Sequence, residues 1–294
     1  MSEYKGYSND KKNQHNSYHK INVGDKGKEV LQGINENSHI IKQFKKYAIE
    51  LDTKHDRYER IVKINRDITI ESKRIIFLLH TLDKESKRNT ILEEAETRIN
   101  NLIKILFKNI ALELYGHDPY LYLKAYRTGF QEFIEAISFY WYLQNNTLFN
   151  WTKLAESMRY RIKDLNENEQ YSVEEKTIQT LIAPVEYILG IADLTGELMR
   201  KCINNLSNGD ISSCYQICNF VRNMYKGFLS CAGITTAEVN KKMYVLKQNL
   251  LKMENVCYTI KVRGSEIPKH MLADVAIVAT EDMTLDIDEG YRVY

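Results

Sequence analysis

The chain has 294 residues, a formal net charge of +2, 3 prolines and 13 glycines. This near-neutral charge neither requires nor excludes a nucleic acid partner, so such binding would have to come from local patches. The scarcity of helix-breaking residues favours long helices and an all-α fold. Five cysteines, an odd number, together with no signal peptide and no apolar run of about 20 residues, predict a reduced, soluble, intracellular protein without a membrane segment.

Hydrophobic periodicity divides the chain into tails and one helical region. Apolar residues recur every three or four positions, as on one face of a helix, and no strand-like alternation of useful length is found. We expect a bundle of about seven helices, at residues 40–82, 89–114, 120–145, within 150–176, 184–206, 213–229 and 236–263, the last capped by Gly264 and Ser265. The predicted organisation is a disordered polar tail 1–36, a single helical domain 37–275 and a mobile acidic tail 276–294.

The predicted helix at 120–145 carries two acidic residues on the side opposite its apolar stripe. Glu132 and Glu135 lie one turn apart at about 100° per residue. One interpretation is an ordinary solvated face. Phe139 projects on the same side, however, which indicates that this face meets something other than water.

The predicted helix at 184–206 shows the same arrangement. Asp193 and Glu197 are four residues apart, and two like charges at that spacing cost about 0.2–0.5 kcal/mol on an isolated helix. Arg200 and Lys201 could offset this repulsion, and a bound cation would offset it better. Gly190 lies one turn earlier on the same stripe, where we expect it to leave open space for a ligand.

Two helices that each offer a carboxylate pair can build a site for a hard cation in a helical bundle. Oxygen ligands without a nearby His or Cys favour Mg²⁺ or Mn²⁺ over zinc. Solvated charge remains the default interpretation of the pattern alone. Cys214 and Cys218 are expected to be core thiols, and His80 a structural or surface histidine.

Basic residues follow the long first helix and could contact a nucleic acid backbone without reading its sequence. They alternate with acidic residues, so an ordinary solvated face is the alternative. The candidate nucleic-acid-binding residues are Arg57, Arg60, Lys63, Arg66 and, on a later helix, Arg200.

Four long strings carry a resemblance to a known family. They are HDRYERIVKINRDITIESKRIIFLLH at 55–80, GFQEFIEAISF at 129–139, EYILGIADLTGELMRKCIN at 186–204 and ENVCYTIKVRGSEIPKHMLADV at 254–275. On these strings the chain resembles the translin-associated factor X branch of the translin family. The resemblance covers nearly everything from residue 40 to 275, except that 150–176 aligns poorly.

The resemblance implies an all-α subunit that assembles with translin into a closed hetero-oligomeric shell binding single-stranded RNA and DNA. It further implies a Mg²⁺-dependent endoribonuclease that removes passenger-strand fragments to activate the RNA-induced silencing complex, in cytoplasm and nucleus. The matching catalytic residues are Glu132, Glu135, Asp193 and Glu197, and we expect Glu135 and Glu197 to be the direct metal ligands. The alternatives are a non-catalytic RNA/DNA-binding or partner-stabilising subunit and a purely helical scaffold.

Overall fold

The computed structural model describes residues 37–82, 85–163, 175–231, 236–263, 266 and 271. The expected tails 1–36 and 276–294, and the cap at Gly264 and Ser265, lie outside these residues. The chain divides after Lys54 into two units, and the description below concerns residues 55 onward unless stated otherwise. In the described part of the chain, no helix is long and apolar enough to cross a membrane.

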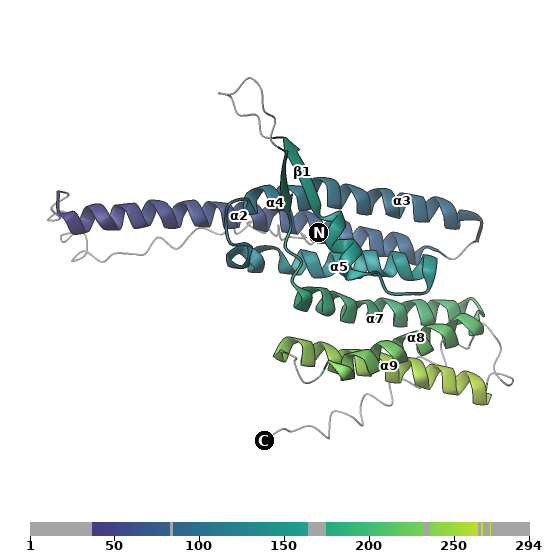
Figure 1. Cartoon of the computed structure of the whole chain (residues 1–294). Helices are drawn as coiled ribbons and strands as arrows, with labels where there is room; N and C mark the ends of the chain where they lie inside the picture. The colour runs from purple at the N-terminus through teal and green to yellow at the C-terminus, as the bar shows by residue number, and fades with distance from the viewer. Residues whose placement is uncertain are drawn as a thin grey trace, which may run out of the picture. The chain divides into compact units, whose positions relative to one another are not determined.

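The described residues are predominantly helical, which confirms the predicted fold class (Figure 1). The helices are α2 His39–His80, α3 Arg88–Asn101, α4 Lys108–Leu114, α5 Leu123–Asn145, α6 Trp151–Ser157, α7 Pro184–Ser207, α8 Ile211–Ser230 and α9 Ala237–Arg263. A π-helical segment, Leu102–Phe107, joins α3 to α4 without a break. Counted with that run as one helix, the described part of the chain contains the seven helices expected.

A short antiparallel hairpin corrects the expectation that no strand is present. Strand β1 spans Arg159–Lys163 and pairs with β2, Glu175–Gln179, so that Tyr160 lies opposite Ile178. Both of these side chains are buried. The Tyr160 hydroxyl donates to the carbonyl of Ile103, at 2.8 Å, inside the π-helical segment. The pattern was missed because strands of five residues give little alternation, and long-range packing stabilises them.

Local signals set the ends of the helices that frame the site. Pro184 occupies the first turn of α7, where its missing N–H costs no helical hydrogen bond. Asn146 ends α5 in the left-handed conformation, at φ 54°. Asp210 caps α8 by accepting from the backbone N–H of Ser213 at 3.1 Å. These signals explain why the predicted boundaries lie within a few residues of the observed ones.

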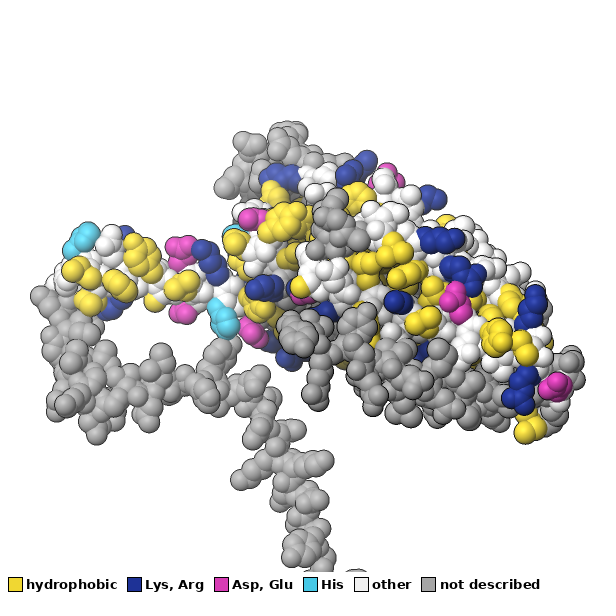
Figure 2. Space-filling model, turned by 90° about the horizontal axis from the view of Figure 1, so that it is seen from below, with side chains coloured by type: hydrophobic (Ala, Val, Ile, Leu, Met, Phe, Trp, Pro, Cys, Tyr) yellow, Lys and Arg dark blue, Asp and Glu magenta, His cyan; other side chains and the backbone are white. Residues whose placement is uncertain are grey.

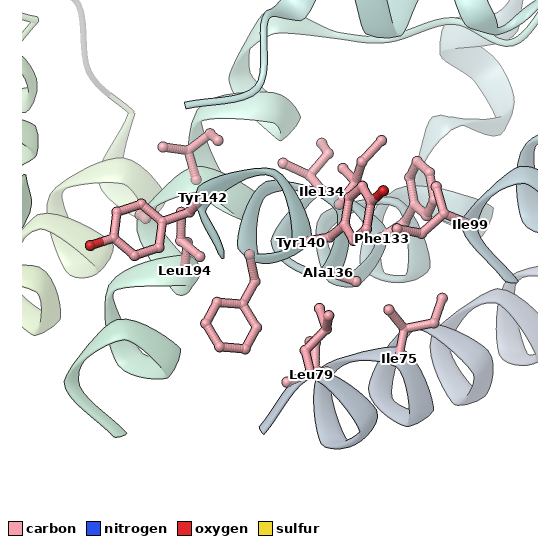
Figure 3. Packing of buried hydrophobic residues seen from close by; sticks show 14 of the residues in the cluster. Ile75, Leu79, Ile99, Phe133, Ile134, Ala136, Tyr140, Tyr142 and Leu194 are labelled. Atoms are coloured by element: carbon pink, nitrogen blue, oxygen red, sulfur yellow. The ribbon is translucent and has the colours of Figure 1, made fainter. Parts of the chain in front are cut away.

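Helix α5 lies at the centre of the hydrophobic core. Figure 3 shows Phe133 and Ile134 of α5 among side chains of α2, α3 and α7, including Ile75, Ile99 and Leu194. All of these residues are buried. Because one face of α5 packs on α2 and another on α7, the core fixes the mutual placement of all three helices.

Two glycines allow α5 to approach its neighbours closely. A Cβ atom on Gly129 of α5 would lie 2.4 Å from the side-chain oxygen of Asn65 on α2. A Cβ atom on Gly190 of α7 would lie 2.7 Å from Cβ of Ile134 and 2.8 Å from the carbonyl oxygen of Gln131 on α5. The expectation that Gly190 leaves space for a ligand is therefore wrong. This glycine is where the backbones of α5 and α7 meet, so no ligand can occupy that position.

Candidate metal centre

The close contact of α5 and α7 brings the two predicted carboxylate pairs together. Glu132 and Glu135 of α5 and Asp193 of α7 line one cavity of about 300 Å³. The remaining wall comes from α7 and α9 and consists of Ala192, Gly196, Lys242, Val245 and Asn249. Glu197, one turn beyond Asp193, does not line this cavity, but its charge acts on Glu135. The sequence pattern alone could not have shown this pairing across helices.

The carboxylates are too enclosed for an ordinary solvated face. The side chains of Glu132, Asp193 and Glu197 are 28%, 27% and 14% exposed. Phe139, expected on the same side as the glutamates, is fully buried, and its ring centroid lies 4.9 Å from that of His80. The glutamate-bearing side of α5 therefore meets protein rather than bulk water, as Phe139 indicated.

Three of the four carboxylates have basic partners. Lys73 of α2 lies 3.5 Å from Glu132. Glu197 lies 2.5 Å from Nε2 of His80 and 3.5 Å from Arg200. The contact to Arg200 matches the expectation that this arginine offsets the acidic pair of α7.

The basic partner of Asp193 comes from α9. The Nζ atom of Lys242 contacts Oδ1 of Asp193. Neither Lys242 nor the role of His80 was found from the sequence. His80 was expected to be an isolated structural or surface histidine, and both residues reach the site only through tertiary packing. Their spacing in the sequence could not have indicated these contacts, because neither residue shares a helix with the carboxylate that it contacts.

Glu135 is the exception among the four. Within the described residues it has neither an ion-pair nor a hydrogen-bond partner. Burial is the largest cause of a raised pKa for this carboxyl group, and repulsion from Asp193, Glu197 and Glu132 adds to it, so that the pKa rises to about 8. Lys242 opposes this rise. A further positive charge near Glu135, such as a bound cation, would also lower this pKa by reducing the repulsion between the carboxylates.

The chemistry of these groups suits a hard divalent cation, because carboxylate oxygens are the ligands that Mg²⁺ and Mn²⁺ prefer. In the present side-chain arrangement, the described residues include no set of three or more Asp, Glu, His or Cys side chains placed to hold a metal ion. Asp193 and Glu197 turn toward Lys242 and His80 instead. Ion binding would therefore require Asp193 to turn away from Lys242, whereas Glu197 contacts His80 and Arg200 through Oε2, so that its Oε1 could bind an ion while His80 keeps the carboxylate oriented.

The predicted nucleic-acid-binding residues fall into two groups. Arg57 and Arg60 are engaged with Glu113, at 3.8 Å and 2.8 Å. Lys63 and Arg66 are exposed on α2, and Arg200 is also exposed beside Glu197. Figure 2 shows one face of the molecule, on which Lys and Arg side chains are interspersed with hydrophobic and acidic ones.

The cysteines agree with the sequence interpretation. Cys214 and Cys218 are both buried and reduced, as expected of core thiols. The backbone carbonyl of Cys202 accepts from the Cys214 thiol at 3.2 Å. These thiols lie in the packing between α7, α8 and α9.

Comparison with known proteins supports the resemblance read from the sequence. Residues 56–264 match the model of the translin family. Translin-associated protein X of Pongo abelii is 41% identical over 296 residues, covering 99% of each chain. The protein of the same name from Rattus norvegicus is 43% identical over 250 residues, covering 83% of this chain and 86% of its own.

Solved structures agree on the fold. The crystal structure of apo-NeC3PO aligns with a TM-score of 0.55 at 18% identity, covering 72% of this chain and 93% of the other. The structure of an AfC3PO–duplex RNA complex aligns with a TM-score of 0.54 at 20% identity, covering 80% and 97%. The family match over residues 56–264 and the identity to the two mammalian proteins place the chain in the translin family.

Proposed function

We propose that this chain is the catalytic subunit of a translin-containing, Mg²⁺-dependent endoribonuclease that cleaves single-stranded RNA. The observation that carries the proposal is Glu135, a half-buried carboxylate without a basic ion-pair partner among the described residues, close to the charges of Glu132, Asp193 and Glu197. Such an arrangement is unfavourable unless a cation is bound or a proton is taken up. Functional sites are where such perturbed groups gather.

The similar proteins support the partner and the substrate class. The mammalian relatives are named for association with translin, and translin itself matches part of this chain, at 25% identity over 145 residues in Gallus gallus. One structure of the same fold is a complex with duplex RNA. From these names and from the resemblance, we propose a hetero-oligomer with translin that binds single-stranded RNA, with single-stranded DNA as a further candidate ligand.

The bound ion would supply a polarised water and neutralise charge that develops on the phosphate. In this proposal Glu135 and Glu197 hold the ion directly, and Mn²⁺ could replace Mg²⁺. Glu132 or Asp193 accepts the proton of the attacking water, or binds the ion through a water. The water oxygen bonds to phosphorus, the phosphodiester P–O bond breaks, and the leaving oxygen takes up a proton.

The basic residues of α2 provide a path to the cavity. Lys63, Arg66 and Lys73 fall on one side of the helix at 100° per residue, and Lys73 contacts Glu132 in the cavity wall. The rise of 1.5 Å per residue places Lys63 and Lys73 about 15 Å apart. We propose that an RNA backbone follows this row of charges, with Arg57, Arg60 and Arg200 as further contacts, so that a phosphodiester reaches the carboxylates.

One assay tests the proposed function. The chain is co-expressed with translin, and the purified complex is incubated with labelled single-stranded RNA in Mg²⁺ or in EDTA. We expect internal cleavage in Mg²⁺ and none in EDTA. A second preparation carrying Glu135→Gln should bind the same RNA without cutting it. Cleavage that persists in EDTA, or in the variant, would overturn the proposal.

The alternative is a non-catalytic RNA/DNA-binding or partner-stabilising subunit. It is favoured by the basic face of α2 and by the absence, in the described residues, of a ready-made set of three metal ligands. It predicts RNA binding that does not respond to Mg²⁺ and no loss of cleavage by the complex when Glu135 is replaced. The enclosure of four carboxylates near one cavity argues against it, since negative charge hinders the binding of a polyanion.

The cellular role is proposed from the resemblance alone. We propose that the complex removes passenger-strand fragments and so activates the RNA-induced silencing complex, in the cytoplasm and the nucleus. Silencing activity of cell extracts depleted of this chain, restored by the wild type and compared with restoration by Glu135→Gln, tests this role. Equal restoration by both proteins would contradict it.

A further inference from the structure

Lys242 of α9 places a positive charge on the wall of the carboxylate cavity. Its Nζ atom contacts Oδ1 of Asp193 on α7, and its charge lowers the raised pKa of Glu135. The side chain lines the cavity and is 35% exposed, so it is also open to solvent. Its ammonium group therefore occupies an oxygen of Asp193 that a metal ion in this cavity would use as a ligand.

Contacts on both sides of Lys242 fasten α9 to the neighbouring helices. One turn earlier, Glu238 pairs with Arg127 of α5, which also lies 3.3 Å from Glu186 of α7. About two turns later, Asn249 donates to the hydroxyl of Thr195 on α7 at 3.2 Å. The backbone at Lys242 is thus held in place beside Asp193, while its partly exposed side chain can leave Asp193 for solvent without moving the helix.

We propose that Lys242 is a built-in competitor of the divalent ion, which shares Asp193 with it and thereby sets the affinity of the site for metal. This inference rests on the proposed function. A lysine ammonium group is a compact point charge on a flexible stem, so it can occupy a cation position and leave it again. When Asp193 turns to the ion, directly or through a water, Lys242 loses its partner and its ammonium group moves into solvent.

The competition has a measurable consequence. Replacing Lys242 by a neutral residue removes both the rival for Asp193 and the repulsion between the ammonium group and the ion. Metal should then bind more tightly, although the protein has lost an ion pair. A merely structural lysine predicts the opposite, because loss of its salt bridge would loosen the site and weaken metal binding.

The test is Mn²⁺ binding to the complex with translin, followed by the electron paramagnetic resonance of the free ion. We expect Lys242→Gln to bind Mn²⁺ at least about threefold more tightly than the wild type, since one nearby positive charge is gone. Lys242→Arg, which keeps the charge, should stay near the wild type. Lys241→Gln removes an exposed lysine next in sequence and should also match the wild type. Equal or weaker binding by Lys242→Gln than by Lys241→Gln would overturn the inference.

A second measurement needs no substitution and applies even if Lys242→Gln does not assemble. The wild-type complex is treated with a lysine-acylating reagent, with and without Mg²⁺, and the modified peptides are quantified by mass spectrometry. Mg²⁺ should increase modification of Lys242 and leave Lys241 unchanged. A Lys242 that does not respond to Mg²⁺ would refute the exchange. If the wild type binds no Mn²⁺ at all, the proposed function itself fails, which is a distinct result.

Discussion

His80 Nε2 lies 2.5 Å from Oε2 of Glu197, although 117 positions separate the two residues in the chain. The last residue of α2 therefore orients a carboxylate of α7, with the His80 ring held against Phe139 of α5. In the proposed site Glu197 is a metal ligand. Residues that hydrogen-bond to a metal ligand fix its orientation, and their removal commonly lowers metal affinity or activity by about 10–100-fold. The first prediction follows from this contact.

We expect His80→Gln to lower RNA cleavage and Mn²⁺ affinity by about 10-fold, because Glu197 loses the group that orients it. His117→Gln, at an exposed histidine, serves as the control. Both are measured on the complex with translin by cleavage kinetics over a range of Mg²⁺ concentrations. If excess Mg²⁺ cannot recover any of the lost rate and Mn²⁺ affinity is unchanged, His80 does not act through Glu197.

The second prediction concerns pH. The pKa of Glu135 is raised from 4.5 to about 8 in the folded protein, so the folded state holds this proton more tightly than the unfolded chain does. The associated stability is present below about pH 4.5 and is lost as pH rises through about 8. In EDTA, the wild type should therefore lose stability from pH 6 to 9, while Glu135→Gln should lose less. Thermal melts of both proteins across this range decide the matter, and parallel curves would contradict the assignment.

The third prediction uses two glycines. Gly190→Ala places a Cβ atom against Gln131 and Ile134 and should lower the free energy of unfolding by about 1–3 kcal/mol. Gly227 lies within α8 with open space where its Cβ would be, so Gly227→Ala should raise stability by about 0.5–1 kcal/mol. Denaturant unfolding measures both. A neutral Gly190→Ala would show that α5 and α7 can separate at little cost.

The fourth prediction concerns the contacts between basic side chains and RNA phosphates. Replacing Lys63 and Arg66 together by Gln should weaken binding equally for different RNA sequences. It should also reduce the slope of log affinity against log salt by about 1.4, because two phosphate contacts on a single strand release about that many counterions. Lys226→Gln, at an exposed lysine of α8, is the control. A sequence-selective loss with an unchanged salt slope would point to base recognition instead.

The fifth prediction concerns the need for a partner. In the unit that precedes His55, the first turns of α2 expose large apolar side chains, each more than half accessible: Ile40, Phe44, Tyr47, Ile49 and Leu51. Exposed apolar surface of this kind commonly belongs to an interface. We expect the chain to aggregate when purified without translin, as seen by light scattering, and to be monodisperse with it. A soluble, nuclease-active monomer would be incompatible with this expectation.

The extent of sequence prediction differs between fold and site. Periodicity placed α2 at 40–82 and the carboxylates on the correct faces, because each depends on residues within one helix. Periodicity does not account for Ile105, an apolar residue of the predicted helix at 89–114 whose side chain is 55% exposed. The π-helical segment changes the angle per residue there, and its geometry depends on packing against the hairpin.

The site was predictable only in part for a similar reason. The spacing of Glu132 and Glu135, and of Asp193 and Glu197, is a property of single helices. That the two pairs face one another depends on the contact at Gly190, and the sequence interpretation gave this glycine a different role. Lys242 lies 49 residues beyond Asp193, so only the folded arrangement of α7 and α9 relates them.

The contacts at Gly129 and Gly190 have a consequence for the energetics of ion binding. Both are backbone approaches that use the absence of a side chain, so the spacing of α2, α5 and α7 is set by the core and not by the charges. Folding free energy therefore holds the acidic helices together against their own repulsion. In the proposed metal site, an ion would meet helices that the core has already placed, so its binding energy would go into turning Asp193 from Lys242 rather than into bringing the helices together.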